Sequence, residues 1–228
     1  MHFRYPGHED DEFADSPLGP IPAGWSAMTL GEVANTQYGF TDSATHSSQG
    51  PKFLRVTDIN KRSYISWPDV PHCSPDAPAK FRLAKGDVVI ARMADPGKLG
   101  IVERDLEAVF ASYLVRVRPA APWLHAYYLY FVLSATAYQE FVLGASTGTT
   151  RKSISAKVME AGPIIRPPEA ILDAFVEAVT PLREGITRLA QLSETLVRSR
   201  DLLLPKLVTG AIDVSKLDLD AFFEESAA

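Results

Sequence analysis

The sequence predicts an α+β fold, with one globular domain over residues 21–167 followed by a long C-terminal helix that forms a coiled coil. Two observations carry this prediction. The first part of the chain combines short apolar runs bounded by turn residues, which are typical of strands, with longer stretches of helical periodicity. Beyond residue 168 the apolar residues recur at spacings of four and three, which is the heptad pattern of a coiled coil.

The first elements of the predicted domain follow an irregular lead-in over residues 1–20, which are acidic and rich in Pro and Gly. Thr29-Leu30-Gly31-Glu32 has the T-x-x-E form of a capping box, so a short helix is predicted to begin near Leu30. Four later segments are predicted to form strands, namely Phe53–Val56, Asp87–Ala91, Leu99–Glu103 and Val109–Arg118. In the last strand, alternation separates an apolar face from a polar face that carries Ser112, Arg116 and Arg118.

The second half of the predicted domain begins with a helix over residues 122–143. Its aromatic and apolar stripe (Tyr127, Tyr128, Phe131 and Val132) could stack on nucleic-acid bases, but helical spacing favours a place in the core. Gly144 is a plausible helix stop, and a polar loop follows over residues 145–153. A short helix and a short strand over residues 163–167 are predicted to complete the domain.

A helical region over residues 168–210 is predicted to serve as a spacer and dimerisation element, ahead of a C-terminal tail over 211–228. Pro181 is expected to kink or restart the helix, and Pro205 to end or bend it near Leu204. The heptad seam consists of Leu182, Ile186, Leu189, Ser193, Leu196, Arg200, Leu203 and Leu207. Its apolar members favour a helix of a second chain, through Leu182, Ile186, Leu189, Leu196 and Leu203. The alternative is that the stripe packs on its own domain.

The distribution of charge permits nucleic-acid binding although the 228-residue chain has a net charge of −5. Residues 36–168 carry sixteen basic and eleven acidic groups, an excess of five positive charges, whereas both flanking segments are acidic. Phosphate binding requires a local positive field rather than a basic chain. Charge alone makes DNA binding only one of several interpretations.

The single cysteine, Cys73, excludes an intrachain disulfide and is typical of a reducing compartment. No apolar run reaches the roughly 18–20 residues of a membrane span, and the N-terminal sequence does not resemble a signal peptide. We therefore expect a cytoplasmic protein that has no membrane partner.

The motifs of common DNA-modifying enzymes do not occur in the sequence. A glycine-rich S-adenosylmethionine turn, an N-P-P-[YF] loop, a P-loop and H-E-x-x-H are all missing, and the five histidines show no ligand spacing. Pro68-Asp69 is not followed by the [DE]-x-K of a metal-dependent nuclease. We therefore expect no catalytic residue, no metal site and no cofactor. A divergent DNA-modifying or DNA-cleaving enzyme fragment with an unrecognised active site is the alternative.

Four segments in a fixed order carry a resemblance to a known family. They are DSPLGPIPAGW with LGEVA (15–34), KGDVVIARM with GKLGIV (85–102), GASTGTTRKSIS with IIRPP (144–168), and SETLVRSRDLLLPKLVTGAIDV (193–214). Together they resemble a specificity (S) subunit of type I restriction–modification systems, in a half-length form with one target-recognition domain. The last segment is the most specific match, and the resemblance covers nearly the whole chain.

This resemblance implies a non-catalytic subunit whose target-recognition domain, here residues 21–167, binds double-stranded DNA. It also implies docking to a methyltransferase (M) subunit and, through it, to a restriction (R) subunit. A usual S subunit has two recognition domains and two helices that pair and set the distance between two half-sites. This sequence holds one of each, so it is expected to form a homodimer or to pair with another half subunit. It does not tell whether the chain is a natural half subunit or a truncated one.

The expected DNA contacts combine the polar loop with basic residues near predicted strand ends. Small residues in the loop let backbone N–H groups approach phosphate, next to hydroxyls and two cations. For any single basic residue, a solvated surface charge is the alternative. The expected contacts are Lys52, Arg55, Arg92, Lys98, Ser146, Thr147, Thr149, Thr150, Arg151 and Lys152. The sequence reveals neither the base sequence read nor which residue touches a base.

Overall fold

The computed structural model describes residues 12–16, 18–45, 47–59, 63–146 and 152–212. The chain divides into two units, of which the first extends to Thr187 and the second begins at Arg188. The first unit is an α+β domain, as predicted. Within the described ranges, no helix is both long enough and apolar enough to cross a membrane.

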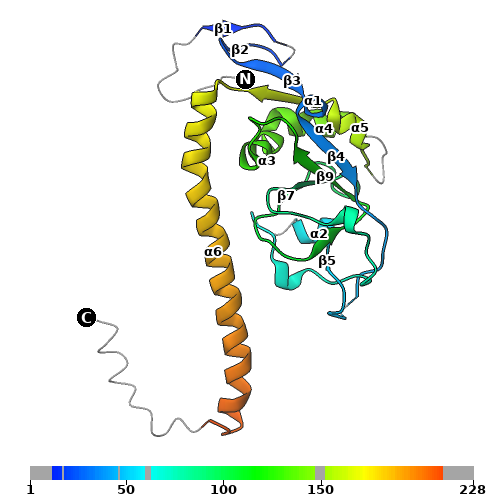
Figure 1. The fold of residues 1–228 in the computed structure, drawn as a ribbon, viewed down its shortest axis with the longest axis vertical. Helices are drawn as coiled ribbons and strands as arrows, with labels where there is room; N and C mark the ends of the chain where they lie inside the picture. The colour runs from blue at the N-terminus through cyan, green and yellow to red at the C-terminus, as the bar shows by residue number, and fades with distance from the viewer. Residues whose placement is uncertain (1–11, 17, 46, 60–62, 147–151, 213–228) are drawn as a thin grey trace, which may run out of the picture. The chain divides into compact units, whose positions relative to one another are not determined.

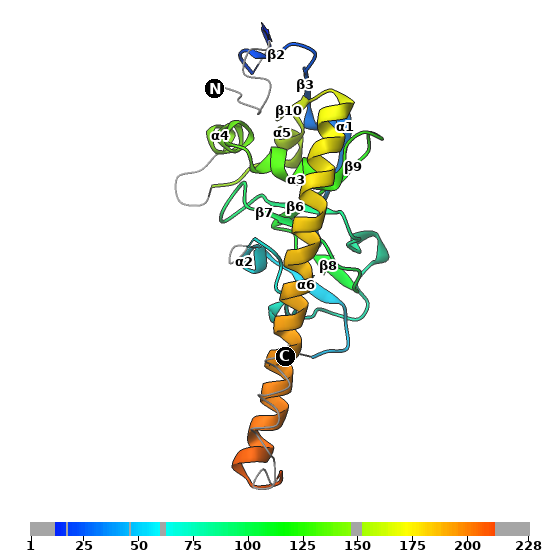
Figure 2. The ribbon, with the colours of Figure 1, turned by 90° about the vertical axis from the view of Figure 1, so that its left-hand side faces the viewer.

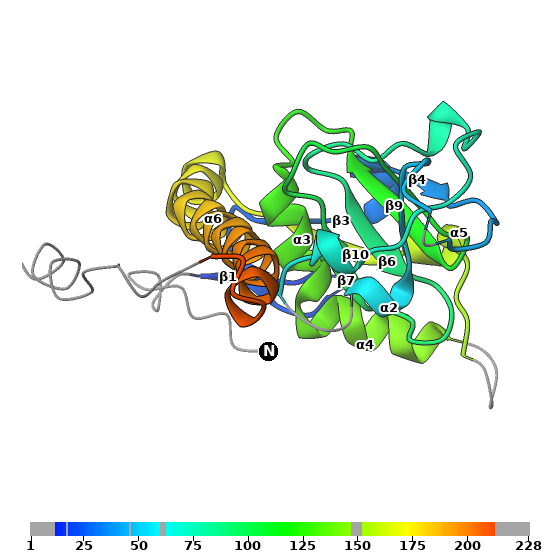
Figure 3. The ribbon, with the colours of Figure 1, turned by 90° about the horizontal axis from the view of Figure 1, so that it is seen from below.

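An antiparallel sheet of four strands organises the first unit (Figure 1). Its strand order is β4 (Ala34–Tyr38), β9 (Leu114–Pro119), β6 (Val88–Ala91) and β7 (Leu99–Ile101). Figure 3 shows β4, β9 and β6 side by side. All four residues of β6 are buried. Burial on both faces explains why this segment is a continuous apolar run rather than an alternating one.

Three smaller strand pairs and several short helices surround this sheet. The pairs are β1 (Phe13–Ala14) with β2 (Ile21–Pro22), β3 (Ser26–Thr29) with β10 (Pro163–Arg166), and, in parallel, β5 (Lys52–Leu54) with β8 (Ala108–Phe110). The short helices are α1 (Leu30–Val33), α2 (Val56–Ile59), η1 (Trp67–Asp69), η2 (Ala79–Phe81) and α5 (Ala156–Glu160). The predicted capping box is confirmed, because the backbone N–H of Thr29 donates to Glu32 Oε2 at 2.6 Å.

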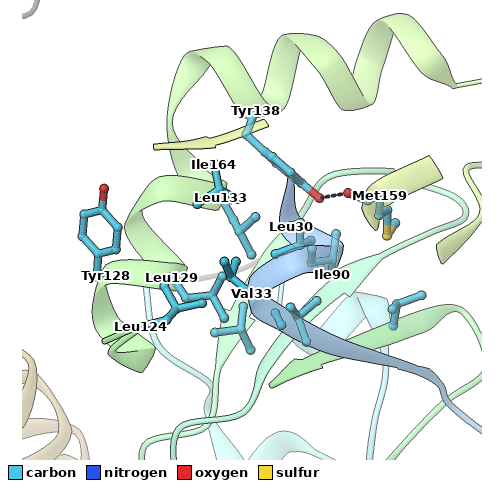
Figure 4. Close-up of a cluster of buried hydrophobic side chains, with 14 of the residues drawn as sticks. Leu30, Val33, Ile90, Leu124, Tyr128, Leu129, Leu133, Tyr138, Met159 and Ile164 are labelled. Atoms are coloured by element: carbon cyan, nitrogen blue, oxygen red, sulfur yellow. Dashed lines mark hydrogen bonds between the residues drawn. The ribbon is translucent and has the colours of Figure 1, made fainter. Parts of the chain in front are cut away.

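Two apolar cores lie on the two faces of the sheet. Val88 and Ile90 face the larger core, which contains residues of α1, α3 (Ala126–Ser134), α4 (Thr136–Ala145) and α5 (Figure 4). Figure 2 shows β6 and β7 close to α3. Val89 and Ala91 face the second core, where Trp67 is buried. The alternating directions of side chains along β6 thus join both cores through one strand.

Two predicted elements are each divided in the structure. The predicted strand Val109–Arg118 is two strands, β8 and β9, separated by a turn that leaves Tyr113 47% exposed. The predicted helix over 122–143 is two helices that meet at Ala135, whose backbone is extended. The Gln139 amide donates to Leu133 O at 2.7 Å, which satisfies a carbonyl at the end of α3 and so stabilises the break.

The long helix α6 runs without interruption over Glu169–Val208, so neither proline has the predicted effect of restarting or ending it. Contacts on both sides of Pro181 hold the helix in place. Leu172 is buried in the larger core before it, and Arg183 forms an ion pair with Glu103 after it. The helix ends three residues beyond Pro205, and Gly210 then takes a φ of 70°. The first part of α6 thus packs on its own domain through Leu172 and Arg183, which lie outside the predicted heptad seam, while Leu182 of that seam is 67% exposed.

Candidate nucleic-acid interface

The ends of several strands converge at the turn that separates β8 from β9. The N–H of Ala111 donates to Leu54 O at 2.9 Å, next to Arg55 at the end of β5. The N–H of Arg92, just after β6, donates to Tyr113 O at 2.9 Å. Tyr38 ends β4 and pairs with Val115 of β9. Side chains that are distant in the sequence are thereby brought to one surface, because strand pairing places their backbones side by side.

Two further segments join this surface beside Arg92. Ile154 N donates to Arg92 O at 3.0 Å, and Met93 pairs with Ser153, so the described end of the polar loop lies along the segment after β6. Ala91 N donates to Lys98 O at 2.8 Å, which places Lys98 across from the end of β6. We call Tyr38, Arg55, Arg92, Lys98, Tyr113, Lys152 and Ser153 the strand-end surface.

Within the strand-end surface, Arg92 is held by an aromatic ring rather than by a carboxylate. Its guanidinium carbon lies 4.9 Å from the centroid of the Tyr38 ring. The Tyr38 hydroxyl in turn accepts a hydrogen bond from Ala156 N at 2.8 Å, and 42% of the tyrosine remains exposed. The ring is therefore anchored at its far end while it offers a face to the arginine.

The two lysines of the strand-end surface are exposed. Lys98 Nζ lies 3.9 Å from Asp95 Oδ2, and both side chains are about half exposed, so this pair contributes little to stability and is easily exchanged for another anion. Lys152 is exposed next to Ser153. Long exposed cations of this kind are suited to neutralising phosphate groups.

Two of the predicted DNA contacts have partners inside the protein. Lys52 Nζ donates to Val70 O at 2.7 Å, and burial lowers the pKa of this lysine, against the opposing effect of Asp69. Arg55 forms a fork with Asp58, with Nη2–Oδ1 at 2.9 Å and Nε–Oδ2 at 3.0 Å. The hydrogen bonds that Arg55 donates to Asp58 raise the pKa of this arginine. Phosphate would have to compete with these partners for either cation.

The remaining predicted contacts lie in the polar loop. The Ser146 hydroxyl donates to Val142 O at 2.7 Å, at the end of α4. Thr147, Thr149, Thr150 and Arg151 lie outside the described residues. The structure thus brings Arg55, Arg92, Lys98 and Lys152 together, and it places Lys52 at the opposite end of the three-residue strand β5.

The arginines of β9 are committed to the domain rather than to its surroundings. Asp87 is buried and accepts from Arg118 Nε at 2.6 Å and Arg118 Nη2 at 2.7 Å. Arg116 donates to Gln37 and to the carbonyl of Arg82. Burial lowers the pKa of Arg116, with a further contribution from the neighbouring Arg118. The polar face that the sequence predicted for this strand therefore has an internal role.

A large groove of the first unit has the wrong charge for phosphate. Its volume is about 860 Å³, and it lies between the first part of α6 and the segment around His125. Its lining includes one lysine, Lys85, and five carboxylates, of which Glu103 is paired with Arg183 and the others are Glu169, Asp173, Glu177 and Glu184. An acidic wall repels a polyanion, so the strand-end surface is the better candidate for nucleic acid.

Sequence reasoning missed the two exposed tyrosines of the strand-end surface. Tyr38 was not singled out, and Tyr113 was assigned to the apolar face of a strand. No motif marks either residue, since their exposure depends on where β4 and β9 meet the turn. Among the described residues, no three His, Cys, Asp or Glu side chains gather as metal ligands.

The predicted dimer contacts divide between the two units. Leu182 of the first unit is 67% exposed, and Ile186 is half-buried there. In the second unit, Leu189 is 67%, Leu196 61% and Leu203 48% exposed. Exposed leucines at heptad spacing are costly in water and are typical of a helix that packs on another helix.

Comparison with known proteins places this fold in context. Over 144 residues, 60% of this chain and 30% of its relative, the sequence is 24% identical to the type I restriction enzyme EcoBI specificity subunit of Escherichia coli. No protein-family model matches the chain.

Solved structures share the fold. The S subunit of a type I restriction–modification system from M. genitalium matches with a TM-score of 0.58 and 16% identity, over 80% of this chain and 45% of that one. The HsdS subunit from Thermoanaerobacter tengcongensis matches with a TM-score of 0.53 and 20% identity, over 78% of this chain and 42% of that one. A structure of a type I restriction–modification system matches with a TM-score of 0.52 and 23% identity, over 83% of this chain and 47% of that one.

The chain spans less than half the length of each of these proteins. By its sequence likeness to the E. coli subunit and by the fold that it shares with the solved structures, the chain is related to the specificity subunits of type I restriction–modification systems.

Proposed function

We propose that this chain reads DNA sequence for a type I restriction–modification complex and leaves the chemistry to partner subunits. The observation that carries the proposal is the strand-end surface, where exposed cations and tyrosines gather on a fold shared with specificity subunits. Lys98 and Lys152 neutralise phosphates and set the position of the domain on the duplex, while Arg92 and the tyrosines lie where base edges would come. One domain of this size contacts one half of a bipartite site.

The proposal assigns double-stranded DNA, a methyltransferase subunit and, through it, a restriction subunit as partners. The acidic groove beside α6 is better suited to a basic protein surface than to DNA, so the methyltransferase subunit is expected on that side of the domain. No step of methyl transfer or cleavage is assigned to residues of this chain.

Reconstitution tests this function directly. The chain, the methyltransferase subunit encoded next to its gene, and the two together are incubated with duplex DNA and S-adenosylmethionine that carries a labelled methyl group. Label should enter DNA only in the mixture, at one sequence motif. Incorporation by the chain alone would instead favour the alternative, a divergent modifying enzyme. Equal incorporation of label by the methyltransferase subunit with and without the chain would refute the proposal that the chain reads the DNA sequence.

Assembly is the second part of the proposal. Two copies related by a two-fold axis would pair their α6 helices through the exposed leucine seam and present two identical domains to a self-complementary, interrupted site. Pairing with a different half subunit is the rival, and it predicts an asymmetric site. Ser193 and Arg200 lie in the seam and would specify its register.

A matched pair of substitutions tests this seam. Leu196 and Leu202 are each 61% exposed on the same helix, but only Leu196 belongs to the heptad pattern. Each buried leucine contributes about 1.5–3 kcal/mol, and a two-fold contact loses two of them in Leu196→Glu. Leu196→Glu should therefore raise the dissociation constant of the dimer at least about 100-fold, whereas Leu202→Glu should leave this constant unchanged. Light scattering at micromolar concentrations measures both, and a monomeric wild type at tens of micromolar would contradict the homodimer.

A further inference from the structure

Arg92 differs from most of the described arginines of the domain in being held by an aromatic ring rather than by a carboxylate, an arrangement that it shares with Arg166 over Trp123. Arg55, Arg118 and Arg183 each form a fork with a carboxylate of the domain. Arg92 makes no ion pair among the described residues, and its side chain contacts the ring of Tyr38. Its Nε is buried without a hydrogen-bond partner, which distinguishes it from Arg166. Among the described residues, no ion pair engages the two terminal NH2 groups of Arg92.

The backbone of Arg92 is fixed on both sides. Its N–H donates to Tyr113 O at 2.9 Å and its carbonyl accepts from Ile154 N at 3.0 Å. Beyond the backbone, the Tyr38 ring lies 4.9 Å from the guanidinium carbon, and that ring is anchored through its hydroxyl to Ala156 N. A planar cation that is held by two backbone bonds and a ring face loses little conformational freedom when it binds.

A buried donor without a partner is a cost to the fold and calls for an explanation. Arg92 keeps this cost although it lies among the exposed residues of the strand-end surface. In this arrangement Nε lacks a hydrogen bond, while the plane of the guanidinium and the direction of its terminal donors are fixed. Lys98, with 52% of its side chain exposed, shows the opposite design, a flexible point charge that tolerates many positions of an anion.

We propose that Arg92 reads a guanine of the target by donating one N–H from each of its two terminal NH2 groups to O6 and N7 in the major groove. This rests on the proposed DNA-reading function and adds to it the identity of one base and the residue that selects it. Guanine is the base that presents two acceptors side by side on its major-groove edge, which matches a planar guanidinium fork. Tyr38 acts as the positioning residue, because its ring sets the plane of that fork.

The test compares target selection by the assembled complex, made from the full chain and its methyltransferase subunit. Duplexes from a randomised library are selected by wild type, by Arg92→Lys and, as a matched control, by Lys98→Ala. The wild type should select a motif that includes an invariant G·C pair in each half contacted by this chain. Arg92→Lys keeps the charge and the stem, so it should fold, but it cannot form the fork. It should lose about 5- to 150-fold of its preference at that one pair and keep the others.

Each outcome decides between the possible roles of Arg92. Lys98→Ala should weaken binding to all selected duplexes alike and keep the motif. If Arg92→Lys keeps the full wild-type motif, whether its affinity falls or not, Arg92 contacts phosphate or nothing, and the proposal is overturned. A wild-type complex that selects no motif at all would instead refute the DNA-reading function. Tyr38→Leu should lower selection of the same pair as Arg92→Lys, and an effect on a different pair would contradict its positioning role.

Discussion

The ion pair between Arg183 and Glu103 provides a sharp test of how α6 is attached to the domain. Both side chains are almost fully buried, with exposed fractions of 5% and 6%. Arg183 Nε donates to Glu103 Oε1 at 2.9 Å, and its Nη2 donates to Oε2 at 2.8 Å and to Ser63 O at 3.1 Å. The guanidinium carbon also lies 5.3 Å from the centroid of the Tyr130 ring. The first part of α6 is thus tied to two separate segments of the domain.

Arg183→Ala would leave the Glu103 carboxylate buried without its counter-charge. Breaking a buried ion pair from one side costs about 3–5 kcal/mol. For a chain of this size, each kcal/mol corresponds to about 2–4 °C in Tm, so a decrease of roughly 6–20 °C is expected. Arg82 offers a control outside the helix seam, since it pairs with Glu107 and both side chains are largely exposed. Arg82→Ala should cost less than about 1 kcal/mol.

Urea unfolding followed by circular dichroism measures both variants, at one protein concentration because self-association would add to apparent stability. Arg183→Met combined with Glu103→Leu should recover most of the loss, because a buried pair can be replaced by apolar residues of similar volume. A loss below about 1 kcal/mol for Arg183→Ala, or one equal to that of Arg82→Ala, would refute the reasoning that this buried pair attaches α6 to the domain.

Three other predictions follow from the described side chains. Lys152→Ala should weaken DNA binding by the assembled complex and lower the slope of log K against log salt by up to about one unit; an unchanged slope would place Lys152 off the DNA. The Nδ1 of His125 accepts a hydrogen bond from Tyr127 N, and burial lowers the pKa of this histidine. The stability that neutral His125 contributes is therefore present above the unfolded pKa of 6.5 and is lost as pH falls through the folded pKa. His125→Asn keeps an acceptor, and its free energy of unfolding should fall less between pH 7 and pH 5; equal slopes would contradict this. Burial, with a smaller effect of Asp42, raises the pKa of the Cys73 thiol to about 11, so a thiol reagent at pH 8 should label it quickly only in urea.

Local patterns in the sequence predicted those elements whose formation depends on neighbours along the chain. The capping box at Thr29 and the apolar strand at Val88–Ala91 are of this kind, since both depend on backbone needs and side-chain periods within a few residues. The same reasoning failed over Val109–Arg118, where a turn between two strands carries no Gly or Pro to mark it. The expectations that Pro181 would restart the helix and that Pro205 would end it were wrong, since α6 continues through both positions. Around Pro181, the packing of Leu172 and the Arg183–Glu103 ion pair offset the local penalty.

The candidate site shows the same division between local and long-range information. The sequence by itself determined that this chain has a mixed domain, a heptad helix, basic residues near strand ends and the ordered segments that resemble specificity subunits. Only the tertiary structure decided which cations are paired with a carboxylate, as Arg55 is with Asp58, and which make no ion pair with a described residue, as with Arg92 beside Tyr38. The physical reason is that an arginine's role depends on the side chains within a few ångströms of it. Arg92 and Tyr38 lie 54 residues apart in the sequence, and they become neighbours because β6 and β4 both pair with β9.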